Sequence, residues 1–268
     1  MKINLELHPE TLPTIKNFVK DYLEHSGAEG YILGLSGGID SAVVCKLLVE
    51  AVGRERVAAL LLPSNTTPSE DMADAVEFAE GLGIEKAEIN IDPLISGFKN
   101  VLGFEMSALH TGNLMARVRM CLLFAFANQN NLLVAGTSNK SELLTGYFTK
   151  YGDGAADVLP IGDLYKTQVK ILARELKIPE KIQNKVPSAG FWKGQRDEEE
   201  LGISYEELDK ILYGMEHFLK TEEIHASTGI QIEKIERVIN IVEKTWHKRR
   251  LGIAPKIGIQ TVGIDWRE

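Results

Sequence analysis

The chain has 268 residues, of which 44% are hydrophobic and 25% charged, a composition typical of folded domains rather than of disordered chains. Its 38 acidic and 30 basic residues give a net charge of −8, which argues against broad electrostatic binding of nucleic acid. The apolar runs at 57–63 and 120–127 are much shorter than the ~20 residues of a membrane span, and the N-terminal residues show no signal-peptide pattern.

Short apolar runs of strand length alternate with stretches of helical periodicity through the first half of the chain. Such alternation is typical of βαβ units, in which helices cover both faces of a buried parallel sheet. We therefore predict an α/β fold with a Rossmann-like parallel sheet, in a single domain over residues 1–268. The predicted strands are 31–35, 57–62, 87–91 and 131–135, and the predicted helices are 9–25, 40–52, 68–82 and 112–128.

The second half contains two long irregular stretches, at 145–165 and 185–202. Loops of this length are uncommon inside a compact domain unless they carry function or are disordered. A helix is predicted to begin at Lys166, and two more at 204–219 and 231–249. We expect the irregular stretches to close over a binding site and exclude water from it.

Residues 34–41, with the sequence GLSGGIDS, lie between a predicted strand and a predicted helix. In such a turn the backbone N–H groups and the helix N-terminus can bind a phosphate. Gly37 and Gly38 have no Cβ, so the backbone can approach an anion closely and adopt positive φ. A carboxylate here, Asp40, is explained by a Mg²⁺ ion that bridges it to the phosphates. The alternative is a capped helix after a glycine turn, and the segment is not a Walker A loop.

Further along the chain, Thr137 and Glu142 follow the fourth predicted strand, at the sheet edge where open parallel sheets bind ligands. Glu142 beside Asp40 would complete a pair of oxygen ligands for Mg²⁺, although a capped helix start would look the same. Lys166 at a helix start opposes the helix dipole and favours an anionic partner. Both cysteines, Cys45 and Cys121, lie on apolar helical stretches and are predicted to be core residues in a reducing, cytoplasmic setting.

The loop at 34–41 resembles the SGGxDS pyrophosphate loop of the N-type ATP pyrophosphatases, which activate a substrate oxygen by adenylation. Further segments then follow in the order typical of the ammonia-dependent NAD synthetases, so the chain from about residue 10 to residue 255 resembles that family. The resemblance implies an adenine nucleotide alpha hydrolase-like fold. The segments that carry it are NLMARVR at 113–119, GTSNKSE at 136–142, YFTKYGDGAAD at 147–157, GDLYKT at 162–167, PSAG at 187–190 and QRDEEELG at 195–202.

The resemblance also implies roles for the residues that match these motifs. Asp40 and Glu142 would bind Mg²⁺, and Asp40 and Lys166 would be catalytic. The family often has threonine where this chain has Ser188, and the hydroxyl group is kept. The implied ATP-binding residues are Gly34, Leu35, Ser36, Gly37, Gly38, Ile39, Asp40, Ser41, Thr137, Lys166 and Ser188, and the implied deamido-NAD-binding residues are Arg117, Lys150, Asp157, His247 and Lys248.

A ligase reaction follows from the resemblance: ATP-dependent amidation of deamido-NAD by ammonia, through an NAD-adenylate, with release of AMP and pyrophosphate. The implied cofactor is Mg²⁺, with ATP as co-substrate, in a cytoplasmic homodimer that has no nucleic-acid or membrane partner. The pattern fills the 268 residues and leaves no room for a glutaminase domain. The alternatives are another adenylating N-type pyrophosphatase, such as a tRNA-modifying enzyme, or an ATP-binding sensor without catalysis. The negative net charge and the lack of a CxxC pair count against a tRNA-modifying enzyme.

Overall fold

The computed structural model describes residues 3–188, 190–192, 194–250 and 252–262. Four parallel strands form one sheet in the order β3-β2-β1-β4. The register places Ile32 opposite both Ala58 and Val134. The carboxyl ends of the strands therefore meet at one edge of the sheet. The strands are β1 (Gly30–Gly34), β2 (Val57–Leu61), β3 (Glu85–Glu88) and β4 (Leu132–Val134).

Alternating residues of the strands face two separate apolar layers, because successive side chains of a strand point to opposite faces. Tyr31 and Leu33 pack into one buried layer, whereas Ile32 packs into the other. Helices cover both faces, so the predicted Rossmann-like parallel sheet is confirmed. One layer contains α1 (Thr11–Ser26), α2 (Ile39–Val52), α3 (Ser69–Leu82), α7 (Lys166–Glu175) and α8 (Glu180–Gln183), and the other contains α4 (Asp92–Leu102) and α5 (Ala108–Asn130).

The strand predicted at 87–91 lies at Glu85–Glu88, so the prediction was shifted along the chain. This edge strand is short and charged, a pattern that discourages pairing with other chains. The apolar residues that suggested the later position still contact β2, since the backbone N–H groups of Ile89 and Ile91 donate to Leu61 and Pro63. The apolar run therefore continues the sheet edge beyond the regular strand.

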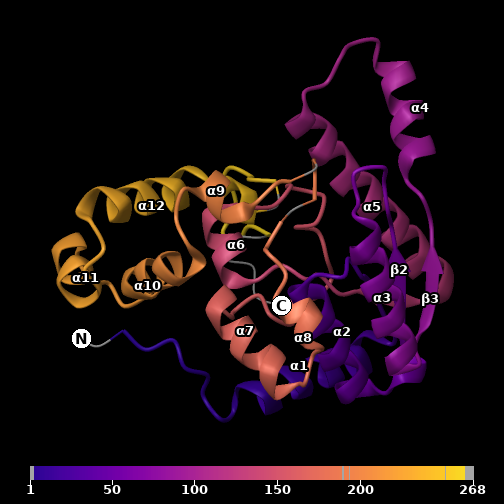
Figure 1. The fold of residues 1–268 in the computed structure, drawn as a ribbon, viewed down its shortest axis with the longest axis horizontal. Helices are drawn as coiled ribbons and strands as arrows, with labels where there is room; N and C mark the ends of the chain where they lie inside the picture. The colour runs from indigo at the N-terminus through magenta and orange to yellow at the C-terminus, as the bar shows by residue number, and fades with distance from the viewer. Residues whose placement is uncertain (1–2, 189, 193, 251, 263–268) are drawn as a thin grey trace.

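A third apolar cluster lies beside the sheet and is built from short helices of the second half (Figure 1). An apolar stripe on its last helix, with Ile235 and Val238 buried, packs against the others. The helices predicted at 204–219 and 231–249 end earlier than expected, the second in a separate 3₁₀ turn. The helices are α6 (Lys140–Thr145), α9 (Asp197–Leu201), α10 (Tyr205–Glu216), α11 (Thr221–Thr228) and α12 (Ile232–Lys244), and the 3₁₀ turns of the chain are η1 (Arg54–Arg56) and η2 (Trp246–Arg249).

The two cysteines differ in exposure. Cys45 is buried as predicted, but Cys121 is exposed, so its assignment to the core was wrong. Cys121 lies four residues from Arg117 and from Ala125, which share its exposed face of α5.

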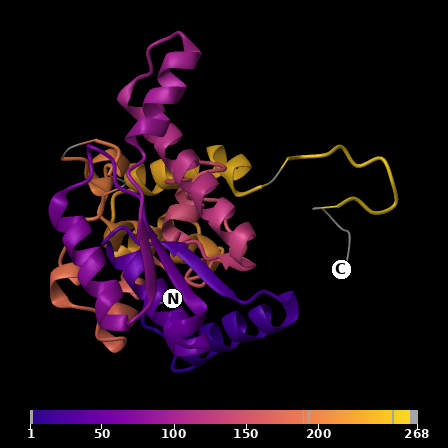
Figure 2. The same ribbon diagram turned by 90° about the vertical axis from the view of Figure 1, so that its right-hand side faces the viewer.

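Helix α4 and the first turns of α5 project beyond the sheet (Figures 1 and 2). No helix in the described part of the chain is long and apolar enough to cross a membrane.

Candidate active site

We call residues 34–41 the phosphate loop; it runs from the last residue of β1 into the first turn of α2, at the carboxyl edge of the sheet. Its two serines hold the turn together: the Ser36 hydroxyl lies 3.1 Å from that of Ser41, which also donates to the Gly38 carbonyl oxygen at 3.0 Å. The side chains of Leu35 and Ile39 are buried in the core beneath the loop. Ser36 is exposed and Ser41 is buried, and the two apolar residues anchor the loop to the core.

Only one of the two adjacent glycines has the backbone conformation that was expected of both. Gly37 has a φ of +79°, and a Cβ on it would lie 2.2 Å from the carbonyl oxygen of Asp71 in α3. Gly38 has a φ of −90° and is extended, so the prediction of positive φ was wrong for this residue. Gly37 is thus required by both its conformation and its contact with α3.

Three elements bring a lysine and two carboxylates together at this edge of the sheet. The ammonium of Lys166, at the start of α7, lies 2.5 Å from Asp40 Oδ2 and 3.3 Å from Glu142 Oε1. Its side chain is 3% exposed. The remaining carboxylate oxygens bond to one residue: Asn139 Nδ2 donates to Asp40 Oδ1 at 3.0 Å, and the Asn139 N–H donates to Glu142 Oε2 at 3.3 Å. The sequence analysis brought the three charged residues together but missed Asn139.

Local sequence explains why Glu142 points here. Asn139 is the N-cap of α6, and its side-chain oxygen accepts from the N–H of Glu142, whose own side chain reaches back to Asn139. This reciprocal capping box satisfies two N–H groups that have no partner within the helix. The capped helix start and the proposed metal ligand, which were alternatives on sequence, are therefore the same structure. The sequence signal for Asn139 was its position three residues before Glu142, the spacing of a capping box.

Asp40, Glu142 and Lys166 are close enough that the charge of each changes the pKa of its neighbours. The pKa of the Glu142 carboxyl is raised to about 8, chiefly because the group is buried; the positive charge of Lys166 opposes this rise, and the negative charge of Asp40 adds to it. For Lys166, burial lowers the pKa, but the charges of Asp40 and Glu142 outweigh that effect and raise it above its usual value. The lysine is therefore held as a cation beside Asp40 and Glu142.

The same carboxylate pair fits a magnesium ion bound jointly with phosphates. Mg²⁺ is commonly held by one or two carboxylates, and substrate phosphates and water supply the other oxygen ligands. Asp40 and Glu142 already converge on one cation, the Lys166 ammonium. Within the described residues, no group of three or more histidine, cysteine, aspartate or glutamate side chains is arranged to hold a metal ion. A metal here would therefore depend on the phosphates of a ligand.

Two of the residues expected to bind ATP lie apart from this cluster. Thr137 is half-buried in the turn between β4 and α6. Ser188 is exposed in the second irregular stretch, where its hydroxyl accepts from the Gly190 N–H at 3.1 Å. Among the described contacts, neither side chain bonds to Asp40 or Lys166.

Four of the five residues expected to bind deamido-NAD are connected. The Arg117 guanidinium donates to the Lys150 carbonyl oxygen at 3.3 Å through Nε and Nη2, and the Lys150 ammonium donates to the His247 carbonyl oxygen at 2.8 Å. Lys248 follows His247, and its ammonium donates to the Gly146 carbonyl oxygen at 2.5 Å. We call Arg117, Lys150, His247 and Lys248 the basic cluster. It joins α5, the loop after α6 and the turn after α12.

Asp157, the fifth residue expected to bind deamido-NAD, and Arg119, a neighbour of Arg117, lie outside the basic cluster. Asp157 is exposed, and its Oδ2 accepts from the Val134 N–H at 2.7 Å, so this carboxylate provides a hydrogen-bond acceptor at the end of β4. It has no hydrogen bond to the basic cluster among the described contacts. Arg119 lies two residues from Arg117 and faces inward, donating to the Leu62 carbonyl oxygen at 2.9 Å. The two arginines, at i and i+2, therefore lie on different faces of the helix.

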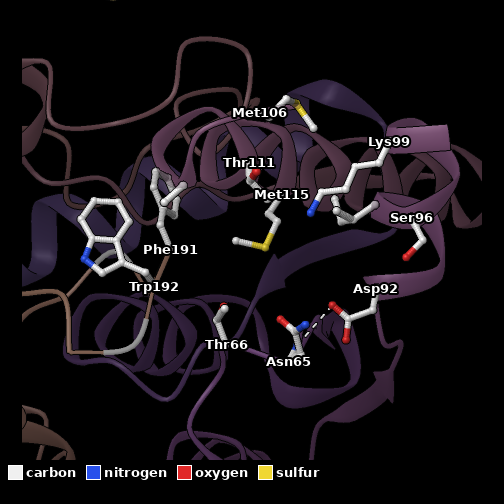
Figure 3. A pocket seen from close by; sticks show the side chains of 12 residues that line it. Asn65, Thr66, Asp92, Ser96, Lys99, Met106, Thr111, Met115, Phe191 and Trp192 are labelled. Atoms are coloured by element: carbon white, nitrogen blue, oxygen red, sulfur yellow. Dashed lines mark hydrogen bonds between the residues drawn. The ribbon is translucent and has the colours of Figure 1, made fainter. Parts of the chain in front are cut away.

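A cavity that the sequence analysis missed lies beyond β2 and β3 at the same sheet edge. It has a volume of about 300 Å³ (Figure 3). Its polar side chains include Asn65, Asp92 and Lys99, and Phe191 and Trp192 form another part of its lining. The aromatic residues belong to the irregular stretch at 185–202, which therefore lies beside the end of the sheet. The sequence signals for this cavity were the apolar run at 57–62, which precedes Asn65, and the length of the irregular stretch at 185–202.

The two irregular stretches are bonded to each other. Glu200 Oε2 accepts from the Tyr147 hydroxyl at 2.5 Å and from Gln195 Nε2 at 3.1 Å. The Gln195 side chain also accepts from the Phe191 N–H at 2.8 Å. Glu200 thus joins the loop that carries Lys150 to the loop that lines the cavity.

A phosphate loop after the first strand, a carboxylate pair at the same edge and an adjacent cavity define the class: a nucleotide-binding α/β protein with a parallel sheet. The family model described as NAD synthase matches residues 11–252. The chain belongs to the NAD synthase family.

Individual relatives agree with this family. The chain is 50% identical over 244 residues to the NH(3)-dependent NAD(+) synthetase of Hyperthermus butylicus, covering 90% of this chain and 88% of the relative. An NMN synthetase from Francisella tularensis has a similar structure, with a TM-score of 0.83 and 40% identity, over 92% of this chain and 98% of that one. An NH3-dependent NAD synthetase from Campylobacter jejuni, solved with a nitrate ion, has a TM-score of 0.79 and 32% identity over the same shares.

Proposed function

We infer that this chain is a ligase that converts deamido-NAD, ATP and ammonia into NAD, AMP and pyrophosphate. The observation that carries this inference is the Asp40–Lys166–Glu142 cluster at the end of the phosphate loop, in a chain of the NAD synthase family. Relatives named as NH(3)-dependent synthetases match nearly the whole chain. We propose that residues 1–268 act as one unit that takes up free ammonia or ammonia from a separate protein.

The reaction needs activation because the oxide of a carboxylate is a poor leaving group. In the first step, the nicotinate carboxylate oxygen bonds to the α-phosphorus of ATP, and the bond from that phosphorus to the bridging oxygen breaks as pyrophosphate leaves. In the second step, ammonia attacks the carbonyl carbon of the adenylate, AMP leaves with the former carboxylate oxygen, and the nitrogen loses a proton. Catalysis of this kind depends on positioning and on charge stabilisation.

The phosphate loop and the cluster supply that stabilisation in our proposal. The backbone N–H groups of residues 34–41 hold the ATP phosphates, and the hydroxyls of Ser36 and Ser41 donate to them. Lys166 turns from its carboxylates to the phosphates, where its positive charge stabilises departing pyrophosphate. Bound by Asp40 and Glu142, Mg²⁺ would supply further positive charge to the same oxygens. We propose that Thr137 and Ser188 add hydroxyl contacts to ATP.

The basic cluster is the proposed site for deamido-NAD. Its guanidinium, ammonium and imidazole groups would face the dinucleotide phosphates and carboxylate, which explains why a chain with a net charge of −8 can bind two polyanionic substrates. Asp157 would act beside it at the end of β4. The cavity near Trp192 lies one strand from the phosphate loop, and we assign it to a nucleoside part of one substrate.

We propose a cytoplasmic homodimer that binds neither nucleic acid nor membrane. The projecting α4–α5 region supports a dimer, because it exposes large apolar side chains: Phe104 is 61% and Val101 is 86% exposed. Exposed apolar residues gathered on one projection are typical of a protein–protein interface. Light scattering tests this proposal, and a monomeric mass at micromolar concentration would contradict it.

One assay tests the reaction and its competitors. The protein is mixed with ATP, Mg²⁺, deamido-NAD and ammonium, and NAD and AMP are measured by chromatography. Nicotinate mononucleotide replaces deamido-NAD in a parallel reaction, because the structural relative from Francisella tularensis is named as an NMN synthetase. We expect NAD and AMP in equal amounts, and a slower reaction with the mononucleotide. Bound ATP without AMP would favour the sensor, and AMP formed only with tRNA would favour a tRNA-modifying enzyme.

A further inference from the structure

Helix α10 supports the Asp40–Lys166–Glu142 cluster with two buried residues that the proposed reaction does not use. Tyr205 and Asp209 lie one helical turn apart, on the same face of α10. The Lys166 ammonium lies 5.2 Å from the centre of the Tyr205 ring. The Asp209 side chain, which is 0% exposed, contacts the first residues of α6 and α7.

Both oxygens of the Asp209 carboxylate are used. Oδ1 accepts from the Ser141 hydroxyl at 2.5 Å, and Oδ2 accepts from the Thr167 N–H at 2.8 Å. The Ser141 hydroxyl oxygen also accepts from the backbone N–H of Lys166 at 2.9 Å. Since that oxygen is already an acceptor, the serine's proton points to Asp209. An ionised carboxylate, which only accepts, matches both of its donors.

These bonds fix the backbone next to two of the three charged residues of the cluster, Glu142 and Lys166. Ser141 directly precedes Glu142, and Thr167 directly follows Lys166. The two segments belong to different helices, so the carboxylate of a third helix sets how far apart they lie. Such supporting contacts orient the side chains that touch a metal or a substrate.

We propose that Asp209 is a positioning residue, which holds Glu142 and Lys166 at the separation needed to act together on the phosphates of MgATP. The proposal rests on the proposed function of the site. A carboxylate that only stabilised the packing of α10 would affect unfolding alone. A positioning residue affects MgATP affinity and turnover in protein that is still folded.

The test replaces Asp209 with a residue of the same shape. In Asp209→Asn an amide that donates replaces one acceptor oxygen, so one of the two donors loses its partner. We expect MgATP affinity and kcat to fall by about 10- to 100-fold, the usual range for residues that support a metal or catalytic site. Calorimetric titration gives the affinity, and the initial rate of AMP formation gives kcat.

Two further variants separate positioning from packing. Leu212→Ala opens a cavity in the same helix without touching the Asp209 bonds, so it should lower the melting temperature and leave both constants unchanged. Ser141→Ala should reproduce the losses of Asp209→Asn. The double variant should be no worse than the more severe single variant, because both changes interrupt the same chain of bonds.

Wild-type affinity and turnover in folded Asp209→Asn would overturn the proposal, as would equal losses in Leu212→Ala. Where Asp209→Asn yields no folded protein, Ser141→Ala tests the chain of bonds from Asp209 through Ser141 to the Lys166 N–H, and it leaves the bond from Thr167 in place. The titration of MgATP requires no product. A wild-type chain that binds MgATP but forms no NAD would therefore refute the proposed function, while the effect of Asp209 on affinity is still measured.

Discussion

Replacing Gly37 with alanine tests whether the phosphate loop is shaped by its contact with α3. The φ of +79° disfavours any L-residue, at a cost of about 1–2 kcal/mol. The new Cβ would also lie 2.2 Å from the Asp71 carbonyl oxygen, which is backbone and cannot rotate away. We expect a total loss of at least about 2 kcal/mol in the free energy of unfolding, because relieving such an overlap adds a further cost.

The matched control is Gly38→Ala in the same loop. Gly38 has a φ of −90°, and its Cβ would lie 3.4 Å from the Ser36 hydroxyl oxygen, an ordinary contact. This control should change the free energy of unfolding by less than about 0.5 kcal/mol. Thermal unfolding without nucleotide measures both, at roughly 2–4 °C per kcal/mol for a chain of this size. Equal melting temperatures for the two variants would refute the reasoning about Gly37.

Three further outcomes are expected. Asp40→Asn should abolish pyrophosphate release, measured by a coupled phosphate assay, and leave the circular dichroism spectrum unchanged; full activity would contradict the metal assignment. Arg117→Ala should raise the KM for deamido-NAD about tenfold or more with little change in the KM for ATP, and equal changes in initial-rate measurements would argue against the basic cluster. Glu142, whose pKa burial raises to about 8, keeps its proton in the folded state where the unfolded chain has lost it. The free energy of unfolding of the metal-free protein should therefore fall as pH rises from about 4.5 towards 8. Urea unfolding measured over this pH range should show a weaker dependence of that free energy on pH in Glu142→Gln than in the wild type.

The sequence predicted the sheet and the phosphate loop because both depend on local patterns. Buried parallel strands are apolar runs, and the glycine turn after the first strand is recognisable by itself. The edge strand at Glu85–Glu88 was misplaced because its charged residues lie at the sheet margin, where burial does not select apolar side chains. The exposed Cys121 was misassigned because α5 is apolar on more than one face.

Asp40, Glu142 and Lys166 were predicted from their positions after strands and at helix starts, whereas the basic cluster was predicted only by resemblance to a family. Asn139 and Asp209 reach the three charged residues through contacts between residues far apart in the chain, and hydrophobic periodicity carries no information on such contacts. The cavity near Trp192 is formed by loops whose closure depends on Gln195 and Glu200, polar residues that a single sequence does not distinguish from surface residues.

Helix α6 is bonded to residues close to the C-terminal end of the described chain. Its six residues are too few to form a stable helix alone. The Arg249 guanidinium donates to the Leu144 carbonyl oxygen at 2.6 Å, and the Lys248 ammonium donates to the Gly146 carbonyl oxygen. The carbonyl oxygens at the end of the helix that carries Glu142 therefore gain these two partners only when residues about a hundred positions later have been made. A ribosome-bound chain that stops before Lys248 contains the residues of all four strands and of the phosphate loop but lacks both bonds.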